Sequence, residues 1–261
     1  MTQFARCYLL VFGQLAAGGL VALAVPPFPD MARGYYKSSA GVFLSMLLLG
    51  AGGTGWLWWT RPESGIGGLD PLLWTLFTLL CAAYMATLWG ERALLRARLY
   101  PVAMLTGLVA VGVSAAGLSP AWPLLGVLDG LASALVLGAV VNGMLIGHWY
   151  LVDPGLTIAP FARSFRWFVG TLWLQVTVLA LALAVLWSRG ASPDLALHLP
   201  LIGMRLALGP LAALGMAALL GRVLAIPQTM AATGLFYIAS LAVLVGEMLG
   251  RYLTFRSGLP L

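Results

Sequence analysis

The sequence predicts an all-α protein, a polytopic transmembrane bundle of about eight helices, on two observations. First, 61% of the 261 residues are hydrophobic and only 8% are charged, whereas about a quarter of an average soluble domain is charged. Second, the apolar residues are gathered in long runs. This composition excludes a disordered chain and a soluble enzyme. The 14 Lys and Arg are spread over the whole chain, so no nucleic-acid partner is expected.

Eight apolar runs follow one another along the chain. They cover about residues 4–25, 40–60, 72–90, 102–118, 124–148, 167–188, 201–220 and 229–253. A bilayer core needs roughly 20 apolar residues per helix, and each run is close to that length. Short segments with proline, glycine or charge connect them, among them 26–30, 61–65, 119–123 and 191–194. None can hold a soluble domain, so residues 1–261 are expected to form a single transmembrane domain of helices.

The first run has an alternative interpretation as a signal peptide, because Ala22-Leu23-Ala24 resembles a cleavage site. We expect an anchored helix instead, since about 18 apolar residues are long for the hydrophobic region of a signal peptide and two prolines follow almost at once. The other interpretation leaves seven spans. The two cysteines, Cys7 and Cys81, fall at opposite ends of separate spans, so we expect no disulfide between them.

Positive charge predicts the orientation of the bundle, because Lys and Arg gather on the cytoplasmic side. The loops on the side of the N-terminus hold five of them, and the other side holds eight: Arg33, Lys37, Arg92, Arg96, Arg98, Arg163, Arg166 and Arg222. Both termini are therefore expected outside, which in a bacterial inner membrane is the periplasmic side. The segment 153–166 is expected to be a basic, aromatic loop on the inner surface, in contact with anionic lipid.

The fifth run carries small residues at every fourth position. Gly126, Gly130, Ala134 and Gly138 form this stripe, and the amide Asn142 continues it. Such a stripe lets a neighbouring helix approach closely, and an Asn can hydrogen-bond across the contact. We expect these residues to pack helices together.

Three charged residues lie inside the runs and away from their ends, where charge is costly and each one is a candidate functional group. Asp129 lies one to two turns after the start of the fifth run, and Arg205 about one turn after the start of the seventh. Glu247 lies about two turns before the end of the eighth. With the termini outside, all three fall in the outer third of the bilayer.

Two further patterns surround these charges. In the eighth run Thr233, Ser240 and Glu247 share a face, and Arg251 stands four residues after Glu247, which favours an ion pair. In the seventh, Pro210 should kink the helix one turn after Arg205. Two interpretations are open: structural pairs Asp129–Arg205 and Glu247–Arg251 that hold the bundle together, or a ligand or proton site.

The two histidines are expected at opposite faces of the membrane, which excludes a haem ligated by both. His148, at the inner end of the fifth run, is either an interfacial residue beside Trp149 and Tyr150 or a functional group, which donates a hydrogen bond to a quinone carbonyl or relays protons. The runs contain no Lys, which excludes a retinal Schiff base. A haem with one axial His and another ligand, such as Met, has no support in the sequence, so no haem held by this chain alone is expected. No Cys-x-x-Cys occurs, so neither an iron–sulfur cluster nor zinc held by this chain alone is expected.

The segment Gly246-Glu247-Met248-Leu249-Gly250-Arg251-Tyr252-Leu253-Thr254-Phe255 resembles the ending of integral membrane subunits of the dimethyl-sulfoxide-reductase and polysulfide-reductase type. The run Gln14-Leu15-Ala16-Ala17-Gly18-Gly19 is similar to the small-residue run in their first helices. The resemblance implies eight or more helices, no haem, and exchange of electrons between quinol and an iron–sulfur partner. It also implies that Glu247 and Arg251 lie near a quinone site.

These observations predict the membrane subunit of a respiratory redox complex, which binds quinone or quinol as its cofactor and takes part in electron transport with partner subunits in the lipid bilayer. Any enzymatic role would be that of a quinone-site subunit of an oxidoreductase. A small transporter or channel is the alternative, although such proteins tend to show inverted repeats, which are not evident here. A purely structural membrane subunit is the third possibility.

Overall fold

The computed structural model describes residues 2–60, 68–90, 92–153, 155–226 and 228–261, in which the only regular secondary structure is helical. Eight helices within these residues are long and apolar enough to cross a membrane. This confirms the expected all-α bundle and indicates an integral membrane protein in a lipid bilayer. The expected connection at 61–65 lies outside the described residues.

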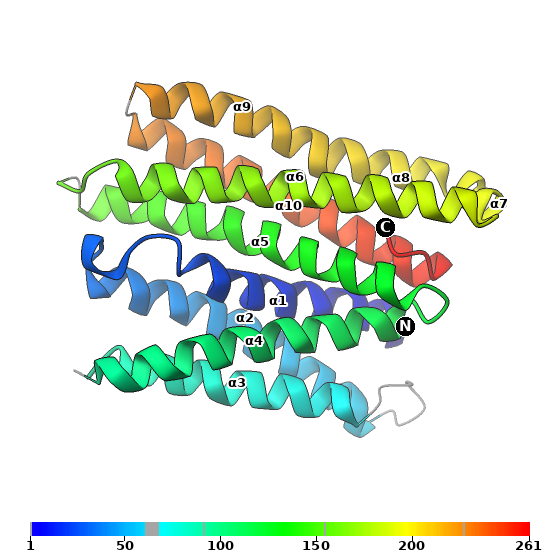
Figure 1. Cartoon of the computed structure of the whole chain (residues 1–261), viewed down its shortest axis with the longest axis horizontal. Helices are drawn as coiled ribbons and strands as arrows, with labels where there is room; N and C mark the ends of the chain where they lie inside the picture. The colour runs from blue at the N-terminus through cyan, green and yellow to red at the C-terminus, as the bar shows by residue number, and fades with distance from the viewer. Residues whose placement is uncertain (1, 61–67, 91, 154, 227) are drawn as a thin grey trace.

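The chain runs up and down through the bundle (Figure 1). Its helices are α1 (Thr2–Ala22), α2 (Arg33–Thr60), α3 (Leu69–Thr87), α4 (Ala93–Leu118), α5 (Pro123–Val152), α6 (Ala159–Ser188), α7 (Ser192–Leu197), α8 (Leu199–Leu206), α9 (Ala212–Ala225) and α10 (Thr229–Ser257). A 3-10 turn, η1 (Phe28–Asp30), follows α1, and a π-helical segment, η3 (Ala207–Leu211), joins α8 to α9. The N-terminus and the C-terminus lie at the same end of the bundle (Figure 1).

Several helices begin well before the apolar runs that predicted them. α2 begins at Arg33 rather than at residue 40, and α4 begins at Ala93 rather than at residue 102. α6 begins at Ala159, so Arg163 and Arg166 lie on its first turns and the expected loop at 153–166 is wrong over most of its length. Hydropathy marks only the part of a helix that lies in hydrocarbon, whereas a helix can continue with charged residues into the headgroup region.

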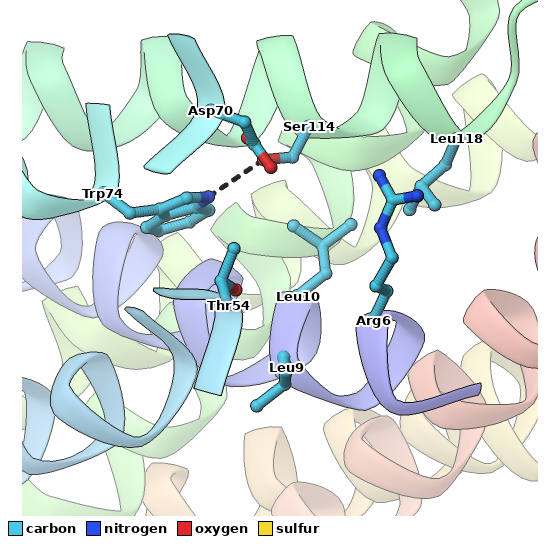
Figure 2. A pocket seen from close by; sticks show the side chains of 8 residues that line it. All are labelled: Arg6, Leu9, Leu10, Thr54, Asp70, Trp74, Ser114 and Leu118. Atoms are coloured by element: carbon cyan, nitrogen blue, oxygen red, sulfur yellow. Dashed lines mark hydrogen bonds between the residues drawn. The ribbon is translucent and has the colours of Figure 1, made fainter. Parts of the chain in front are cut away.

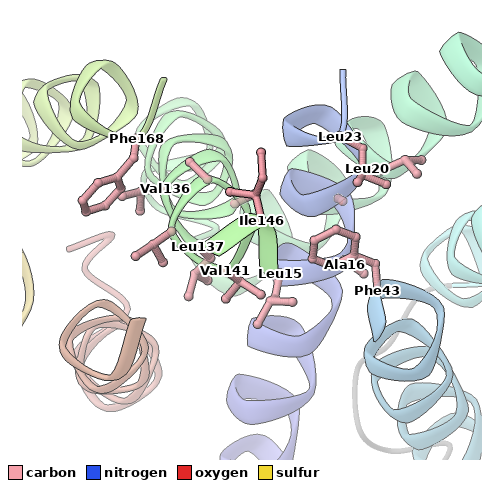
Figure 3. Packing of buried hydrophobic residues seen from close by; sticks show 14 of the residues in the cluster. Leu15, Ala16, Leu20, Leu23, Phe43, Val136, Leu137, Val141, Ile146 and Phe168 are labelled. Carbon is pink, nitrogen blue, oxygen red and sulfur yellow. The ribbon is translucent and has the colours of Figure 1, made fainter. Parts of the chain in front are cut away.

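Helix α5 lies at the centre of the bundle, where it contacts α1, α2, α4, α6 and α10. Its buried side chains include Leu137, Val141 and Ile146, which Figure 3 shows among side chains from neighbouring helices. A helix that is apolar on all sides is expected to be enclosed by others. The polar residues that α5 carries are therefore held inside the protein.

Small residues allow the closest approach, between α1 and α5. A Cβ added to Gly138 would collide with the backbone of Gly18, and one added to Gly18 would collide with the backbone of Ala134. Gly126 and Gly130 pack in the same way against Ala115 of α4. The stripe of small residues is therefore shared between α1 and α4.

The amide that continues the stripe joins three helices. Asn142 accepts a hydrogen bond of 2.7 Å from the Tyr35 hydroxyl of α2, and its Nδ2 donates to the Ala22 carbonyl of α1 at 3.2 Å. The Asn142 side chain is buried, so both bonds replace water that the site excludes.

The seventh span is broken where the sequence predicts it. Pro210 has no N–H to donate, and the five residues of η3 that contain it form a π-helical segment between α8 and α9. At this point Gly209 approaches Gly246 of α10 so closely that a Cβ on either residue would press on the other's Cα. The break therefore brings α10 against the turn that follows Arg205.

Candidate functional site

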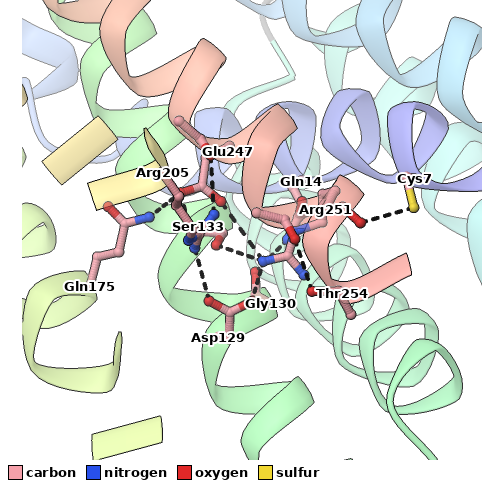
Figure 4. Close-up of polar contacts among 12 residues, drawn as sticks. Cys7, Gln14, Asp129, Gly130, Ser133, Gln175, Arg205, Glu247, Arg251 and Thr254 are labelled. Atoms are coloured by element: carbon pink, nitrogen blue, oxygen red, sulfur yellow. Dashed lines mark hydrogen bonds and ion pairs between the residues drawn. The ribbon is translucent and has the colours of Figure 1, made fainter. Parts of the chain in front are cut away.

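Four charged side chains meet in the interior of the bundle, near the end that carries both termini (Figure 4). They are Asp129 of α5, Arg205 of α8, and Glu247 and Arg251 of α10, and none is more than 2% exposed. We call these four residues the charge cluster. The three charges that the sequence places at one depth thus lie side by side, together with the arginine that follows Glu247.

Asp129 is the shared acceptor of the charge cluster. Its Oδ1 accepts a hydrogen bond of 3.2 Å from Arg205 Nη2, and its Oδ2 accepts one from Arg251 Nη2. Glu247 lies beside the same two guanidinium groups, with Oε1 3.7 Å from Arg205 Nη2 and Oε2 3.8 Å from Arg251 Nη2. Two cations and two anions balance, and this balance is what makes complete burial tolerable.

Neutral groups complete the charge cluster. Gln175 Nε2 of α6 donates to Glu247 Oε1, and Arg251 Nη2 donates to the Ser133 hydroxyl at 3.1 Å. Arg205 Nη1 donates to the Gly246 carbonyl at 3.2 Å. The cluster therefore connects α5, α6, α8 and α10 through polar contacts.

Helix α1 is joined to the site by two bonds to backbone carbonyls. Cys7 donates from Sγ to the Arg251 carbonyl at 3.0 Å, and Gln14 Nε2 donates to the Gly130 carbonyl at 2.9 Å. The second cysteine, Cys81, is buried elsewhere, and both thiols are free.

Glycine makes room for one of the arginines. The Arg205 side chain crosses α10 at Gly250, where an added Cβ would overlap its guanidinium group. Arg205 reaches Asp129 only because residue 250 has no side chain.

Three atoms of the charge cluster have no hydrogen-bond partner among the described residues: Arg205 Nε, Arg251 Nε and Glu247 Oε2. Since Gln175 binds the other oxygen of Glu247, Oε2 can take a proton without breaking that bond. Buried polar groups usually find partners, and the exceptions gather at sites with a chemical role or a water molecule.

Two of the six residues predicted for the ligand or proton site lie apart from the charge cluster. The Ser240 hydroxyl donates to the Phe236 carbonyl at 2.7 Å and lies 3.3 Å from the Val140 carbonyl, two turns before Glu247. His148 is exposed near the far end of α5, with Nδ1 3.5 Å from the Tyr237 hydroxyl. His198 lies at the start of α8, at the opposite end of the bundle.

The sequence did not single out the neutral partners Gln175, Ser133 and Gln14, or a second polar site at Asp70. Asp70 accepts a hydrogen bond from Ser114, whose hydroxyl accepts one of 2.9 Å from Trp74 Nε1 (Figure 2). These groups line a cavity of about 20 Å³ with Arg6 and Thr54, enough for about one water molecule. The sequence could have indicated the two glutamines as polar partners, since an uncharged amide in the middle of an apolar run also needs a hydrogen-bond partner.

An aromatic groove lies between α1 and α10. Phe4, Tyr8 and Tyr252 line its mouth, and the rings of Phe4 and Tyr8 meet edge to face with centroids 4.6 Å apart. Its volume is about 420 Å³, and its remaining lining residues are Val245, Met248 and Leu249. Met248 and Tyr252 directly follow Glu247 and Arg251 in the chain, so the groove and the charge cluster lie on two sides of the same turns of α10.

Within the described residues, no group of three or more His, Cys, Asp and Glu side chains is placed to hold a metal ion. Comparisons of the chain with protein-family models, with curated proteins and with solved structures find no match.

Proposed function

We propose that the chain is the membrane subunit of a respiratory redox complex in the bacterial inner membrane, where it binds quinol and receives its protons while partner subunits take its electrons. The observation that carries the proposal is the charge cluster. Burying four charges costs several kcal/mol per ion before their attraction is counted, so such groups in a membrane protein are functional candidates by default.

Oxidation of a quinol releases two protons and two electrons. In this proposal the electrons leave to an iron–sulfur protein, the partner that the resemblance of residues 246–255 implies. The protons need an acceptor, and Glu247 Oε2 is the buried carboxylate oxygen that has no hydrogen bond among the residues described. A carboxylate binds one proton at a time, so in this proposal Glu247 passes the first proton on before it receives the second. Arg205 and Arg251 lie beside this carboxylate, with their Nη2 atoms 3.7 and 3.8 Å from its oxygens.

The aromatic groove is the place proposed for the quinol ring. Tyr8 and Tyr252 offer flat faces for stacking, and the apolar lining suits an isoprenoid tail that enters from lipid. The resemblance of residues 246–255 to the ending of quinol-oxidising membrane subunits supports the same place, because both Glu247 and Tyr252 belong to that segment.

A small transporter or channel is the second candidate, favoured by one feature. The π-helical break at Ala207–Leu211 lies directly after Arg205, and transporters often build their sites at broken helices. Flux of labelled solutes into proteoliposomes that hold the purified chain would identify this function.

Extraction of quinone from the purified protein tests the main proposal. We expect a quinone to copurify with the wild-type chain, and Tyr252→Leu to reduce its amount several-fold because the ring loses its stacking partner. Tyr237→Leu is the matched control, since Tyr237 is an exposed tyrosine of the same helix outside the groove. Absence of quinone from the wild-type protein, or equal loss in both variants, contradicts the proposal.

A further inference from the structure

A second cavity lies at the end of the bundle opposite the termini. It has a volume of about 320 Å³ and lies where the end of α1 meets η1 and the adjoining ends of α2, α3 and α4. Its walls are largely aromatic and apolar, and its residues are Leu23, Ala24, Pro26, Phe28, Tyr36, Tyr84, Ala93, Arg96, Ala97 and Tyr100.

Among the described residues that line this cavity, Arg96 is the only charged one. Its guanidinium carbon lies 4.4 Å from the centre of the Phe28 ring, which fixes the group in place. The Nη1 atom of Arg96 is buried and has no hydrogen-bond partner among the described residues. A fixed guanidinium with an unused donor is a binding group for an oxyanion such as phosphate.

Two of the three tyrosines, Tyr36 and Tyr100, supply an apolar wall rather than further polar groups. The Tyr36 hydroxyl donates to the Pro26 carbonyl at 2.7 Å, and the Tyr100 hydroxyl donates to the Leu20 carbonyl. With both hydroxyls engaged, these residues present their rings to the cavity. A matching ligand therefore has one anionic group and a long apolar part.

The position on α4 adds to the attraction for an anion. Ala93 and Arg96 belong to the first turn of this helix, where backbone N–H groups carry positive partial charge, and the N-cap residue makes no side-chain hydrogen bond to them. The same end of the bundle carries eight of the 14 Lys and Arg of the sequence. Anionic phospholipids populate the leaflet that such positively charged ends face.

We propose that this cavity binds an anionic phospholipid, with the headgroup phosphate at Arg96 and an acyl chain along the tyrosine wall. The site does not depend on the function proposed for the charge cluster, because the two lie at opposite ends of the bundle.

Native mass spectrometry of the delipidated full chain tests this site, with dioleoylphosphatidylglycerol, dioleoylphosphatidylcholine and inorganic phosphate as probes. We expect phosphatidylglycerol to bind more tightly than phosphatidylcholine, and inorganic phosphate alone not to bind. Arg96→Gln should weaken the binding of phosphatidylglycerol by about tenfold or more, because the phosphate loses one hydrogen bond from a charged donor. Arg98→Gln, which removes an exposed charge from the same helix, should change binding less than twofold.

A filling variant keeps the test valid if Arg96→Gln does not fold. Ala97→Trp should fill the cavity without changing the charge, and should therefore weaken the binding of phosphatidylglycerol. Leu94→Trp, at an exposed position outside the lining, should leave that binding unchanged. Equal binding of the two lipids, binding of phosphate alone, or equal losses in the Arg96 and Arg98 variants would overturn the proposal.

Discussion

Asp129 is the residue on which the charge cluster depends most. It accepts hydrogen bonds from both arginines, so Asp129→Asn leaves two buried cations facing one carboxylate. Removal of one partner from a buried ion pair costs about 3–5 kcal/mol, and we expect a loss of that size in the free energy of unfolding.

Reversible unfolding in mixed micelles measures this loss, and Asp30→Asn is the matched control. Asp30 pairs with Arg163 at 3.1 Å, and both side chains are about two-fifths exposed, so its loss should cost at most about 1 kcal/mol. Similar losses in the two variants would show that Asp129 does not hold the bundle together.

Gly250→Ala should disturb the charge cluster without changing any charge. The new Cβ would occupy the place of the Arg205 guanidinium, which must then leave Asp129. We expect a lower melting temperature, whereas Gly234→Ala on the same helix, where an added Cβ meets nothing within 4 Å, should leave it unchanged or raise it. If Gly250→Ala melts at or above the wild-type temperature, the crossing of Arg205 over residue 250 is wrong.

At the scale of helices, the close contact between α1 and α5 controls the assembly of the bundle. Gly138→Leu must push the two helices apart, because the backbone of Gly18 lies against the place of the new side chain. Overpacking of this kind costs about 1–3 kcal/mol, and a backbone obstacle cannot rotate away as a side chain does. Reversible unfolding in mixed micelles measures this cost. The control is Gly170→Leu on α6, where an added Cβ meets nothing within 4 Å. Equal stability of the two variants would contradict the packing.

The sequence predicted the number of long helices and the level at which three charges meet, because apolar length and helical rise determine both. It did not predict where the helices begin. α2 and α4 extend into charged and aromatic residues, whose place in a helix depends on neighbours rather than on hydropathy. The short helix α7 replaces the expected connection at 191–194 for the same reason.

The charge cluster was predictable only in part. Spacing along each helix gave the depth of Asp129, Arg205 and Glu247, but which helices are neighbours follows from the whole packing. The sequence therefore left open that Asp129 binds Arg251 as well as Arg205, and that Gln175 comes from α6. Ser240 shares the face of Glu247, yet two turns of helix separate the two side chains.

At the scale of the whole molecule, both termini lie at one end of the bundle, and the distribution of Lys and Arg predicts that this end faces the outside. Arg256→Cys should therefore react with a membrane-impermeant maleimide on intact spheroplasts, and Arg98→Cys only after lysis. Background labelling should be low, since Cys7 and Cys81 are each 1% exposed. Labelling of both positions from the same side would contradict the eight-span topology.

Quinol oxidation by membranes that carry Glu247→Gln, measured against pH and beside the melting temperature of the same variant, tests the proposed function most directly. The glutamine keeps the shape of Glu247 but takes up no proton at Oε2, so we expect a folded protein, a quinol turnover at least about tenfold lower, and a changed pH profile. Unchanged turnover and pH profile in a folded Glu247→Gln protein would show that Glu247 receives no protons. A loss of turnover that only follows a loss of folding would also contradict the proposal, because Glu247 would then hold the bundle together without taking part in proton transfer.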